Sequence, residues 1–491
     1  MSTRNWMKSN LNWVERAGAL FLMCAATAIT LTAQTFTTLH SFDGTDGEVP
    51  WAVLQANDGN LYGTTELGGT NDVGTVFKIT PSGTLTTVYS FCSQSGCTDG
   101  EAPSAPLVQA TDGNFYGATY DGGANGDGTV FKITPSGTLT TLYSFCSQPN
   151  CADGALPFAA PVLATDGNLY GTTAYGGANG FYGTGTVFKL TTDGTLTTLY
   201  SFCSQSGCTD GKEPEAALVQ ATDGNFYGTT SRGGANGGRG TVFKITPSGA
   251  LTRLYSFCSQ SGCTDGAFPY TALVQATDGN FYGTTSGNGA NHGGTVFKIT
   301  PSGTLTTVYS FCSQSGCTDG ELPEAALVQA TDGNFYGTTY DGGANGYGTV
   351  FKTTPTGALT TLYSFCSQSN CADGDYPFAA LVQATDGSFY GTTYGGGANG
   401  EYGTVFSVSV GLRPFVETQP TFGKVGKSVK ILGTNLTGAT SVTFNGTPAV
   451  FTVVSRSLII TTVPAGATTG TVRVTIPTGT LKSNLPFKVR P

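Results

Sequence analysis

"LVQATDGNFYGATYDGGANGDGTVFKITPSGTLTTLYSF", residues 107–145, holds the pattern that decides the fold. Short runs of apolar, aromatic and β-branched residues alternate with segments rich in Gly, Asp and Pro, which is typical of short antiparallel strands. The "TDGN" segment favours a tight hairpin, because Asp and Gly tolerate the positive φ angles that two-residue turns need. We therefore predict four strands, over residues 105–110, 115–120, 129–134 and 139–145.

The same pattern occurs seven times along the chain. "DGNFYG" or a close variant begins at Asp58, Asp112, Asp166, Asp223, Asp278, Asp332 and Asp386. Four strands in a repeat of about 54 residues are typical of one β-propeller blade, and seven blades lie within the usual range for a closed ring. The repeats therefore predict an all-β chain with a seven-bladed β-propeller over residues 34–410.

The two ends of the repeat region complement each other. "FTTLHSF" (36–42) matches a fourth strand whose first three strands are missing, and the seventh repeat stops at "GTVFSVSV" (403–410) without its fourth strand. We expect residues 36–42 to pair with residues 404–410 and to complete the seventh blade. Closure in this way removes the open sheet edge of a linear stack, which would otherwise need capping repeats.

Composition and the first 33 residues indicate where the protein is placed. Charged residues make up only 11% of the chain and the net charge is −9 without a basic cluster, which argues against nucleic acid as a partner. Residues 1–33 combine three basic residues with the apolar stretch 17–33, the pattern of a secretory signal peptide. An uncleaved membrane anchor is the alternative, but the stretch is short for a span. We expect a secreted or cell-surface protein with no transmembrane span in the mature chain.

Twelve of the thirteen cysteines form six Cys-x4-Cys pairs, each following a predicted fourth strand. Secretion favours oxidation of such pairs. Metal half-sites are the alternative, but His40 and His292 are the only imidazoles available. We predict six local disulfides: Cys92–Cys97, Cys146–Cys151, Cys203–Cys208, Cys258–Cys263, Cys312–Cys317 and Cys366–Cys371.

One position in the repeat is a candidate ligand site. A proline precedes each predicted first strand, and the residue after it alternates between aromatic and polar types: Trp51, Ser104, Phe158, Glu215, Tyr270, Glu324 and Phe378. The first strand of a blade is innermost, so these side chains would meet at the mouth of the central channel. Trp51, Phe158, Glu215, Tyr270, Glu324 and Phe378 are the predicted ligand-binding residues, with carbohydrate as the ligand. The alternative is that the aromatic rings wedge between blades while the carboxylates face water.

Other polar positions give weaker signals. Each blade connection contains an Asp-Gly pair whose carboxylate is expected to cap a turn: Asp46, Asp99, Asp153, Asp210, Asp265, Asp319 and Asp373. We expect no cofactor; the alternative is that these carboxylate oxygens bind calcium. His292 is the best single acid–base candidate, but no catalytic set accompanies it. We therefore predict a binding protein for an extracellular glycan or protein, with an extracellular hydrolase or lyase, or a self-assembling matrix protein, as alternatives.

Two resemblances extend this interpretation. The repeat quoted above is similar to that of the secreted bacterial "choice-of-anchor tandem repeat GloVer" proteins over about residues 36–410, which implies an extracellular or surface place and no catalytic residues. After a linker at residues 411–414, residues 415–491 resemble an IPT/TIG domain. The match includes Gly426, Val429, Ile431, Gly433 and Asn435, then Val442, Phe444, Gly446, Val463 and Pro464. That resemblance implies an immunoglobulin-like β-sandwich acting as a spacer or interaction module.

Overall fold

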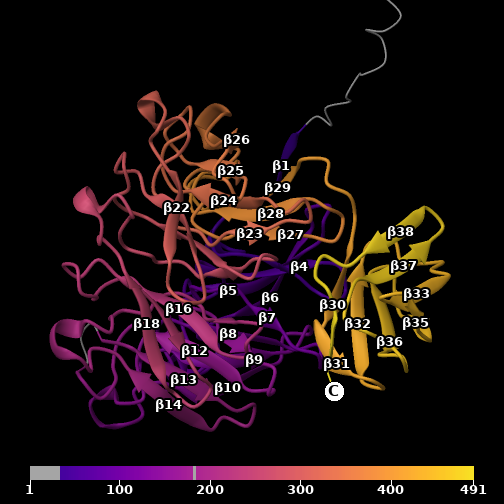
Figure 1. Ribbon diagram of the computed structural model, residues 1–491, viewed down its shortest axis with the longest axis horizontal. Helices are drawn as coiled ribbons and strands as arrows, with labels where there is room; N and C mark the ends of the chain where they lie inside the picture. The colour runs from indigo at the N-terminus through magenta and orange to yellow at the C-terminus, as the bar shows by residue number, and fades with distance from the viewer. Residues whose placement is uncertain (1–33, 181–183, 491) are drawn as a thin grey trace, which may run out of the picture.

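The computed structural model describes residues 34–180 and 184–490, so the predicted signal peptide lies outside the described residues. Within these ranges the protein is all-β, with antiparallel sheets repeated along the chain and a further group of sheets near the C-terminus (Figure 1). Its helices are three-residue 3-10 turns: η1 (Ser95–Cys97), η2 (Pro149–Cys151), η3 (Ser206–Cys208), η4 (Ser261–Cys263), η5 (Ser315–Cys317) and η6 (Ser369–Cys371). No helix of the described ranges is long and apolar enough to cross a membrane.

The second to sixth repeats each form one sheet from four successive strands, and the first and last repeats follow the same plan with the additions given below. The first strands are β3 (Leu54–Gln55), β7 (Val108–Gln109), β11 (Val162–Leu163), β15 (Val219–Gln220), β19 (Val274–Gln275), β23 (Val328–Gln329) and β27 (Val382–Gln383). The second strands are β4 (Leu61–Leu67), β8 (Phe115–Thr119), β12 (Leu169–Thr173), β16 (Phe226–Thr230), β20 (Phe281–Thr285), β24 (Phe335–Thr339) and β28 (Phe389–Thr393).

The outer half of each sheet follows the same plan. The third strands are β5 (Thr75–Ile79), β9 (Thr129–Ile133), β13 (Thr186–Leu190), β17 (Thr241–Ile245), β21 (Thr295–Ile299), β25 (Thr349–Thr353) and β29 (Thr404–Ser409). The fourth strands are β6 (Leu85–Ser90), β10 (Leu139–Ser144), β14 (Leu196–Ser201), β18 (Leu251–Ser256), β22 (Leu305–Ser310), β26 (Leu359–Ser364) and, in the last sheet, β1 (Thr35–Ser41). The first sheet also holds β2 (Glu48–Pro50), which pairs with β4.

The strand that completes the last sheet comes from the start of the described chain. Strand β1 pairs antiparallel with β29, and Phe36 lies opposite Val408 while Ser41 lies opposite Thr404. Figure 1 shows indigo β1 beside orange β29. The strand pairing predicted for residues 36–42 and 404–410 is therefore present.

The first strands are shorter than predicted, and their neighbours explain why. Residues 105–110 were expected to pair throughout, yet only Val108 and Gln109 join the ladder of β8. The carbonyl of Ala105 instead accepts a hydrogen bond from Thr64 Oγ1 of the preceding sheet at 2.8 Å. Because the Ala105 carbonyl bonds to a threonine of the neighbouring sheet, the residues before Val108 connect two sheets and do not lengthen strand β7.

The hydrophobic core lies between consecutive sheets. Tyr62, Val76 and Phe91 of the first sheet pack with Phe115 and Phe131 of the second, and all five side chains are buried. A Cβ on Gly117 would lie 2.6 Å from Phe131 Cζ, so the "FYG" motif needs its glycine to admit that ring. An equivalent cluster joins the first sheet to the last. Leu61 and Phe77 of the first sheet pack with Tyr390 and Val405 of the last sheet and with Phe42, which follows β1. Burial thus links the last repeat to the first as it links the second to the first.

A glutamine in the first strand also bonds each sheet to its neighbour. Gln109 Oε1 accepts a hydrogen bond from the Asn57 backbone N–H at 2.9 Å, and Gln55 Oε1 accepts one from the Thr385 N–H at 2.8 Å. The remaining bonds of this type are Thr165–Gln220, Thr222–Gln275, Thr277–Gln329 and Thr331–Gln383. We call these contacts the glutamine latches. Leu163 takes the place of the glutamine between the second and third sheets.

The C-terminal module has two four-stranded sheets and a two-stranded pair. The sheets are β30 (Val416–Gln419), β32 (Ser428–Gly433), β36 (Leu458–Thr462) and β35 (Phe451–Val453), and β34 (Thr447–Pro448), β33 (Ser441–Phe444), β37 (Val472–Ile476) and β38 (Gly479–Lys482). Strands β31 (Phe422–Lys424) and β39 (Lys488–Arg490) pair in parallel. The module contacts the hairpin turns of the repeats, where Ser457 Oγ donates to Asn57 O at 3.1 Å and Thr434 Oγ1 lies 2.9 Å from Thr385 Oγ1.

Candidate functional site

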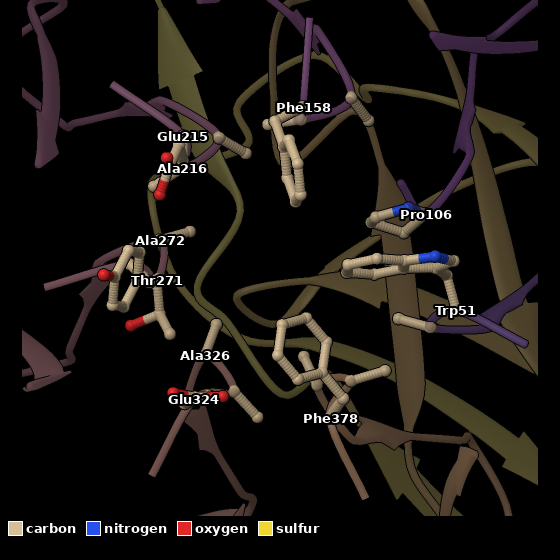
Figure 2. Close-up of a pocket in the computed structure, with 18 of the residues that line it drawn as sticks. Trp51, Pro106, Phe158, Glu215, Ala216, Thr271, Ala272, Glu324, Ala326 and Phe378 are labelled. Atoms are coloured by element: carbon tan, nitrogen blue, oxygen red, sulfur yellow. The ribbon is translucent and has the colours of Figure 1, made fainter. Parts of the chain in front are cut away.

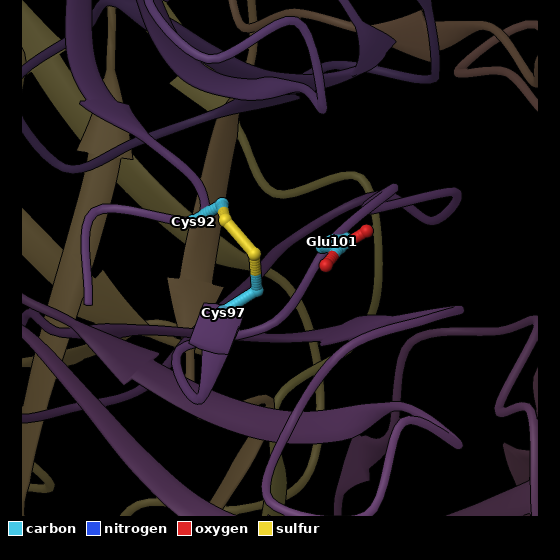
Figure 3. Close-up of side chains that lie close together, drawn as sticks. All are labelled: Cys92, Cys97 and Glu101. Atoms are coloured by element: carbon cyan, nitrogen blue, oxygen red, sulfur yellow. A yellow bond between two sulfur atoms is a disulfide. The ribbon is translucent and has the colours of Figure 1, made fainter. Parts of the chain in front are cut away.

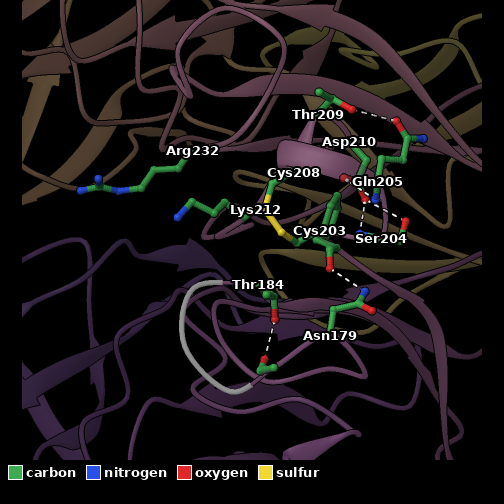
Figure 4. Close-up of a disulfide and its surroundings, with 12 residues drawn as sticks. Asn179, Thr184, Cys203, Ser204, Gln205, Cys208, Thr209, Asp210, Lys212 and Arg232 are labelled. Carbon is green, nitrogen blue, oxygen red and sulfur yellow. Dashed lines mark hydrogen bonds between the residues drawn. A yellow bond between two sulfur atoms is a disulfide. The ribbon is translucent and has the colours of Figure 1, made fainter.

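All six predicted disulfides are present, each next to a 3-10 turn. Figure 4 shows Cys203–Cys208 beside Asp210, whose carboxylate accepts hydrogen bonds from the backbone N–H groups of Ser204 and Gln205 at 2.9 and 3.3 Å. The Tyr200 hydroxyl donates to the same carboxylate at 2.8 Å, and burial beside it raises the pKa of Tyr200 to about 12. The recurrent Asp-Gly carboxylate therefore caps the disulfide loop, as expected. The tyrosine partner was not foreseen.

An acidic side chain accompanies some of these disulfides. Figure 3 shows Glu101 close to Cys92 and Cys97, and the carboxylate oxygen lies within 4.8 Å of both sulfur atoms. Thiolates, and not disulfide sulfurs, bind metal ions. With the pair oxidised, Glu101 is left as the single carboxylate of this group, which fits the structural role predicted for the cysteines.

The seven residues that follow the repeat prolines converge on one cavity of about 300 Å³. They are Trp51, Ser104, Phe158, Glu215, Tyr270, Glu324 and Phe378, each from a different repeat. The next residues in the chain also line it and are small: Ala52, Ala159, Ala216, Thr271, Ala325 and Ala379. The placement expected from the sequence is therefore present, and the small side chains beside each large one leave the space open.

Aromatic rings line one side of this cavity, which we call the aromatic arc: Phe378, Trp51 and Phe158. The Trp51 ring meets Phe378 edge to face with centroids 5.0 Å apart, and it meets Phe158 in the same way at 6.0 Å. Trp51 Nε1 donates to Glu66 Oε2 at 3.2 Å, which fixes the orientation of the indole. Figure 2 shows the three rings grouped on one side of the cavity.

Carboxylates line the opposite side, which we call the acidic arc: Glu215 and Glu324, with Tyr270 between them in the repeat order. Figure 2 shows Glu215 and Glu324 on the side of the cavity opposite the rings. Burial, reinforced by Glu213, raises the pKa of Glu215 to about 7. Burial together with Asp341 raises the pKa of Glu324 to about 7. Both residues line the cavity and are partly buried.

Several residues around the cavity mouth were missed by sequence reasoning. Tyr120 packs edge to face on Phe158 with centroids 5.3 Å apart, and Tyr340 does the same to Phe378 at 6.1 Å. Ser104 Oγ is buried without a hydrogen-bond partner among the described residues. Tyr120, Glu66 and Tyr340 all occupy the position just after the last threonine of the "YGTT" or "YGAT" segment of the second strand. That position varies between repeats as much as the post-proline one does, and this variation was the available signal.

A second cavity, of about 390 Å³, lies between the repeats and the C-terminal module. First-strand residues such as Leu107 and Gln109 line one side, and Glu417 and Phe422 line the other. The C-terminal module thus covers the ends of the first strands on the side opposite to the disulfide loops. His292 lies in a loop between β20 and β21 and does not line either cavity, whereas His40 Nε2 contacts Asp46 Oδ2 at 2.7 Å.

Comparison with known proteins identifies both parts of the chain. The Gloeobacter/Verrucomicrobia repeat model matches residues 16–208, 148–330 and 315–441, and the IPT/TIG domain model matches residues 416–489. No curated protein matches the chain.

Among solved structures, the chain is similar to an extracellular domain from B. thetaiotaomicron assigned to a one-component system, with 11% identity and a TM-score of 0.49 over 92% of this chain. It spans 48% of that structure, about half its length. It is also similar to a protein of Bacteroides uniformis described as a 6-phosphogluconolactonase, with 18% identity and a TM-score of 0.41 over 70% of this chain and 92% of the other. A protein of unknown function from Dyadobacter fermentans matches with 10% identity and a TM-score of 0.42 over 76% and 97%. On its family matches, the chain belongs to the Gloeobacter/Verrucomicrobia repeat family and carries an IPT/TIG domain.

Proposed function

We propose that this chain is an extracellular binding protein and that the cavity between the two arcs takes a carbohydrate. The observation that carries the proposal is the convergence of seven post-proline side chains, one per repeat, on a single cavity. Aromatic faces pack against the apolar faces of sugar rings, while carboxylates accept hydrogen bonds from hydroxyl groups. A concave site with aromatic walls and a few converging polar groups is the usual form of a small-ligand site.

The proposed architecture is a seven-bladed β-propeller closed by β1, spanning residues 34–410. A linker at residues 411–414 and an immunoglobulin-like module at residues 415–491 follow it. The pairing of β1 with β29 supports closure, as do the core cluster and the glutamine latch that join the first and last sheets. Closure is what brings Phe378 of the last repeat against Trp51 of the first. Export of the mature chain after a signal peptide at residues 1–33 agrees with six disulfides, which persist in oxidising compartments.

A second function is favoured by one observation. Two carboxyl groups with pKa values of about 7 line the same cavity, and paired carboxyl groups are the usual machinery of glycoside hydrolysis. A group with a pKa near neutrality can donate a proton to a leaving oxygen. The second candidate is therefore an extracellular glycosidase that uses Glu215 and Glu324.

The test is a glycan-array screen of residues 34–491, followed by calorimetric titration of each hit. We expect Trp51→Ala and Phe378→Ala to weaken binding at least about tenfold, since each removes a wall of the cavity. Phe451→Ala, which removes a half-buried ring from the C-terminal module, is the matched control and should bind as the unmodified protein does. Binding that survives both cavity substitutions in folded protein would place the ligand elsewhere. Mass spectrometry of the incubated glycans decides between binding and hydrolysis, because only the glycosidase releases shorter products.

A further inference from the structure

The two carboxylates of the acidic arc lack a cationic partner. Among the described residues, ion pairs at 4.0 Å or less include neither Glu215 nor Glu324. Arg232 lies close enough to Glu215 to lower its pKa, but its Nε lies 2.8 Å from Glu213 Oε2, and Lys212 Nζ lies 3.7 Å from Glu213 Oε1. Glu213 therefore takes that guanidinium as its own partner.

The lysines of the third strands are engaged away from the cavity. The lysine that recurs in the third strands pairs with the Asp of the hairpin turn in its own repeat. Lys298 Nζ, for example, lies 2.9 Å from Asp278 Oδ2. The same pairing recurs for Lys78, Lys132, Lys189, Lys244 and Lys352. These turns lie at the opposite ends of the strands from the post-proline residues. Among the described residues, Glu215 and Glu324 therefore form no ion pair of their own, and their burial in a partly desolvated cavity disfavours the charged forms.

The remaining walls of the cavity suit a positive group. Trp51, Phe158 and Phe378 present π systems opposite the carboxylates, and tryptophan is the aromatic ring that attracts cations best. An ammonium group is small, carries donors for both carboxylates, and is stabilised by charge-assisted hydrogen bonds. A ligand with a carboxylate or sulfate would instead meet like charge at the acidic arc.

We infer that the acidic arc binds an ammonium group, so that the ligand is a saccharide with a free amino group. This rests on the proposed function, because it specifies the class of carbohydrate that the cavity takes. The raised pKa values of Glu215 and Glu324 agree with it, since a bound ammonium would supply the partner that both carboxyl groups lack. Glu213, Arg232, Tyr120 and Tyr175 also face Glu215, Asp341 and Tyr340 face Glu324, and Tyr270 faces both.

The experiment compares two oligosaccharides of equal length by isothermal titration calorimetry at pH 7, using residues 34–491. One is the glucosamine tetramer, and the other is the N-acetylglucosamine tetramer, in which each amine is blocked and uncharged. We expect the free-amine tetramer to bind at least about tenfold more tightly, and we expect binding to release protons as the carboxyl groups ionise. Titration in two buffers of different ionisation enthalpy measures that release.

Substitutions assign the preference to the acidic arc. Glu324→Gln and Glu215→Gln keep the shape of the side chain and should each reduce the preference at least about threefold, because free-amine binding should weaken more than N-acetylglucosamine binding. Glu321→Gln, in the same loop but outside the cavity lining, is the matched control and should keep the full preference. Circular dichroism of each variant confirms that it is folded before titration.

The outcomes separate the inference from the proposed function. Equal binding of both tetramers, or tighter binding of the acetylated one, overturns the ammonium inference and leaves a carbohydrate site. If only a neutral or acidic glycan binds, and Trp51→Ala abolishes that binding, the ammonium inference is likewise overturned and the carbohydrate site remains. If no glycan binds the folded protein, both the inference and the proposed carbohydrate function are overturned.

Discussion

The residue after each proline occupies one backbone position in seven repeats, yet its chemistry differs from repeat to repeat. The residue before that proline has a positive φ in every repeat, from 51° at Ala102 and Tyr376 to 61° at Phe268. Non-glycine residues adopt this conformation rarely and at a cost of about 1 kcal/mol or more. The repeat therefore holds a sharp local bend with side chains other than glycine. That bend directs the post-proline side chain into the cavity. The backbone at this position is therefore the same in every repeat, and only the side chain differs.

The acidic arc makes stability depend on pH. The pKa of Glu324 is raised to about 7 in the folded protein, chiefly by burial, against about 4.3 in an unfolded chain. The folded state therefore keeps a proton that the unfolded state releases, so the free energy of unfolding falls as the pH rises from about 4.5 to about 7. We expect Glu324→Gln to be more stable than the unmodified protein by roughly 2 kcal/mol at pH 8 and equal to it at pH 4.5.

Urea unfolding followed by circular dichroism at the two pH values measures this difference. Glu321→Gln should change stability little at either pH, because this side chain lies outside the cavity. A Glu324→Gln variant that is less stable than the unmodified protein at pH 8 would show that the carboxylate has a stabilising partner in the folded state.

At the scale of the element, the disulfide loop is a repeated unit with its own internal supports. The Cys203–Cys208 disulfide closes a short ring, and Asp210 binds the backbone of that ring from inside. Loop-closure entropy gives about 2 kcal/mol for a ring of this size. We expect Cys203→Ser combined with Cys208→Ser to lower the free energy of unfolding by about that amount, measured by urea unfolding without reductant. The change should vanish when both proteins are compared in excess reductant; a difference that persists there would mean that the serines act through packing and not through the lost bond.

Most of the strands and part of the candidate site could be predicted from the sequence. The predicted strands 115–120, 129–134 and 139–145 match β8, β9 and β10 within a residue, because alternation and turn chemistry are local properties. Strand β7 came out shorter, since its length depends on a hydrogen bond from Thr64 in another sheet. The post-proline cavity could be predicted because its position recurs in every repeat.

Other parts of the site could not be read from the sequence. The hydrogen bond from Trp51 to Glu66 depends on how two elements meet in space, and nothing in the local pattern of either strand specifies it. The contact of Ser457 with Asn57 depends on where a separate module docks. Asn57 replaces the threonine of the other six turns, but Ser457 bonds its backbone carbonyl, which every residue type has, so this difference does not specify the contact.

At the scale of the whole molecule, the glutamine latches distinguish a ring from an open row. Gln275 joins two sheets that are adjacent in sequence, whereas Gln55 joins the first sheet to the last. In a closed ring Gln55 bonds the buried Thr385 and Gln275 bonds the exposed Thr222, so Gln55→Leu should lower the free energy of unfolding by about 1 kcal/mol and Gln275→Leu by a smaller amount. Urea unfolding of the two variants measures this. In an open row Gln55 would have no partner, and only Gln275→Leu would be destabilising.

The central claim is that seven repeats close a ring whose shared cavity holds an amino saccharide between an aromatic and an acidic arc. A crystal structure of residues 34–491 grown with the glucosamine tetramer tests it most directly. The predicted result is one sugar ring against Trp51 with an amine of the tetramer bound by the acidic arc, in a ring of sheets closed by β1 against β29. A structure with the first and last sheets apart, or with the tetramer bound anywhere but this cavity, would contradict the account.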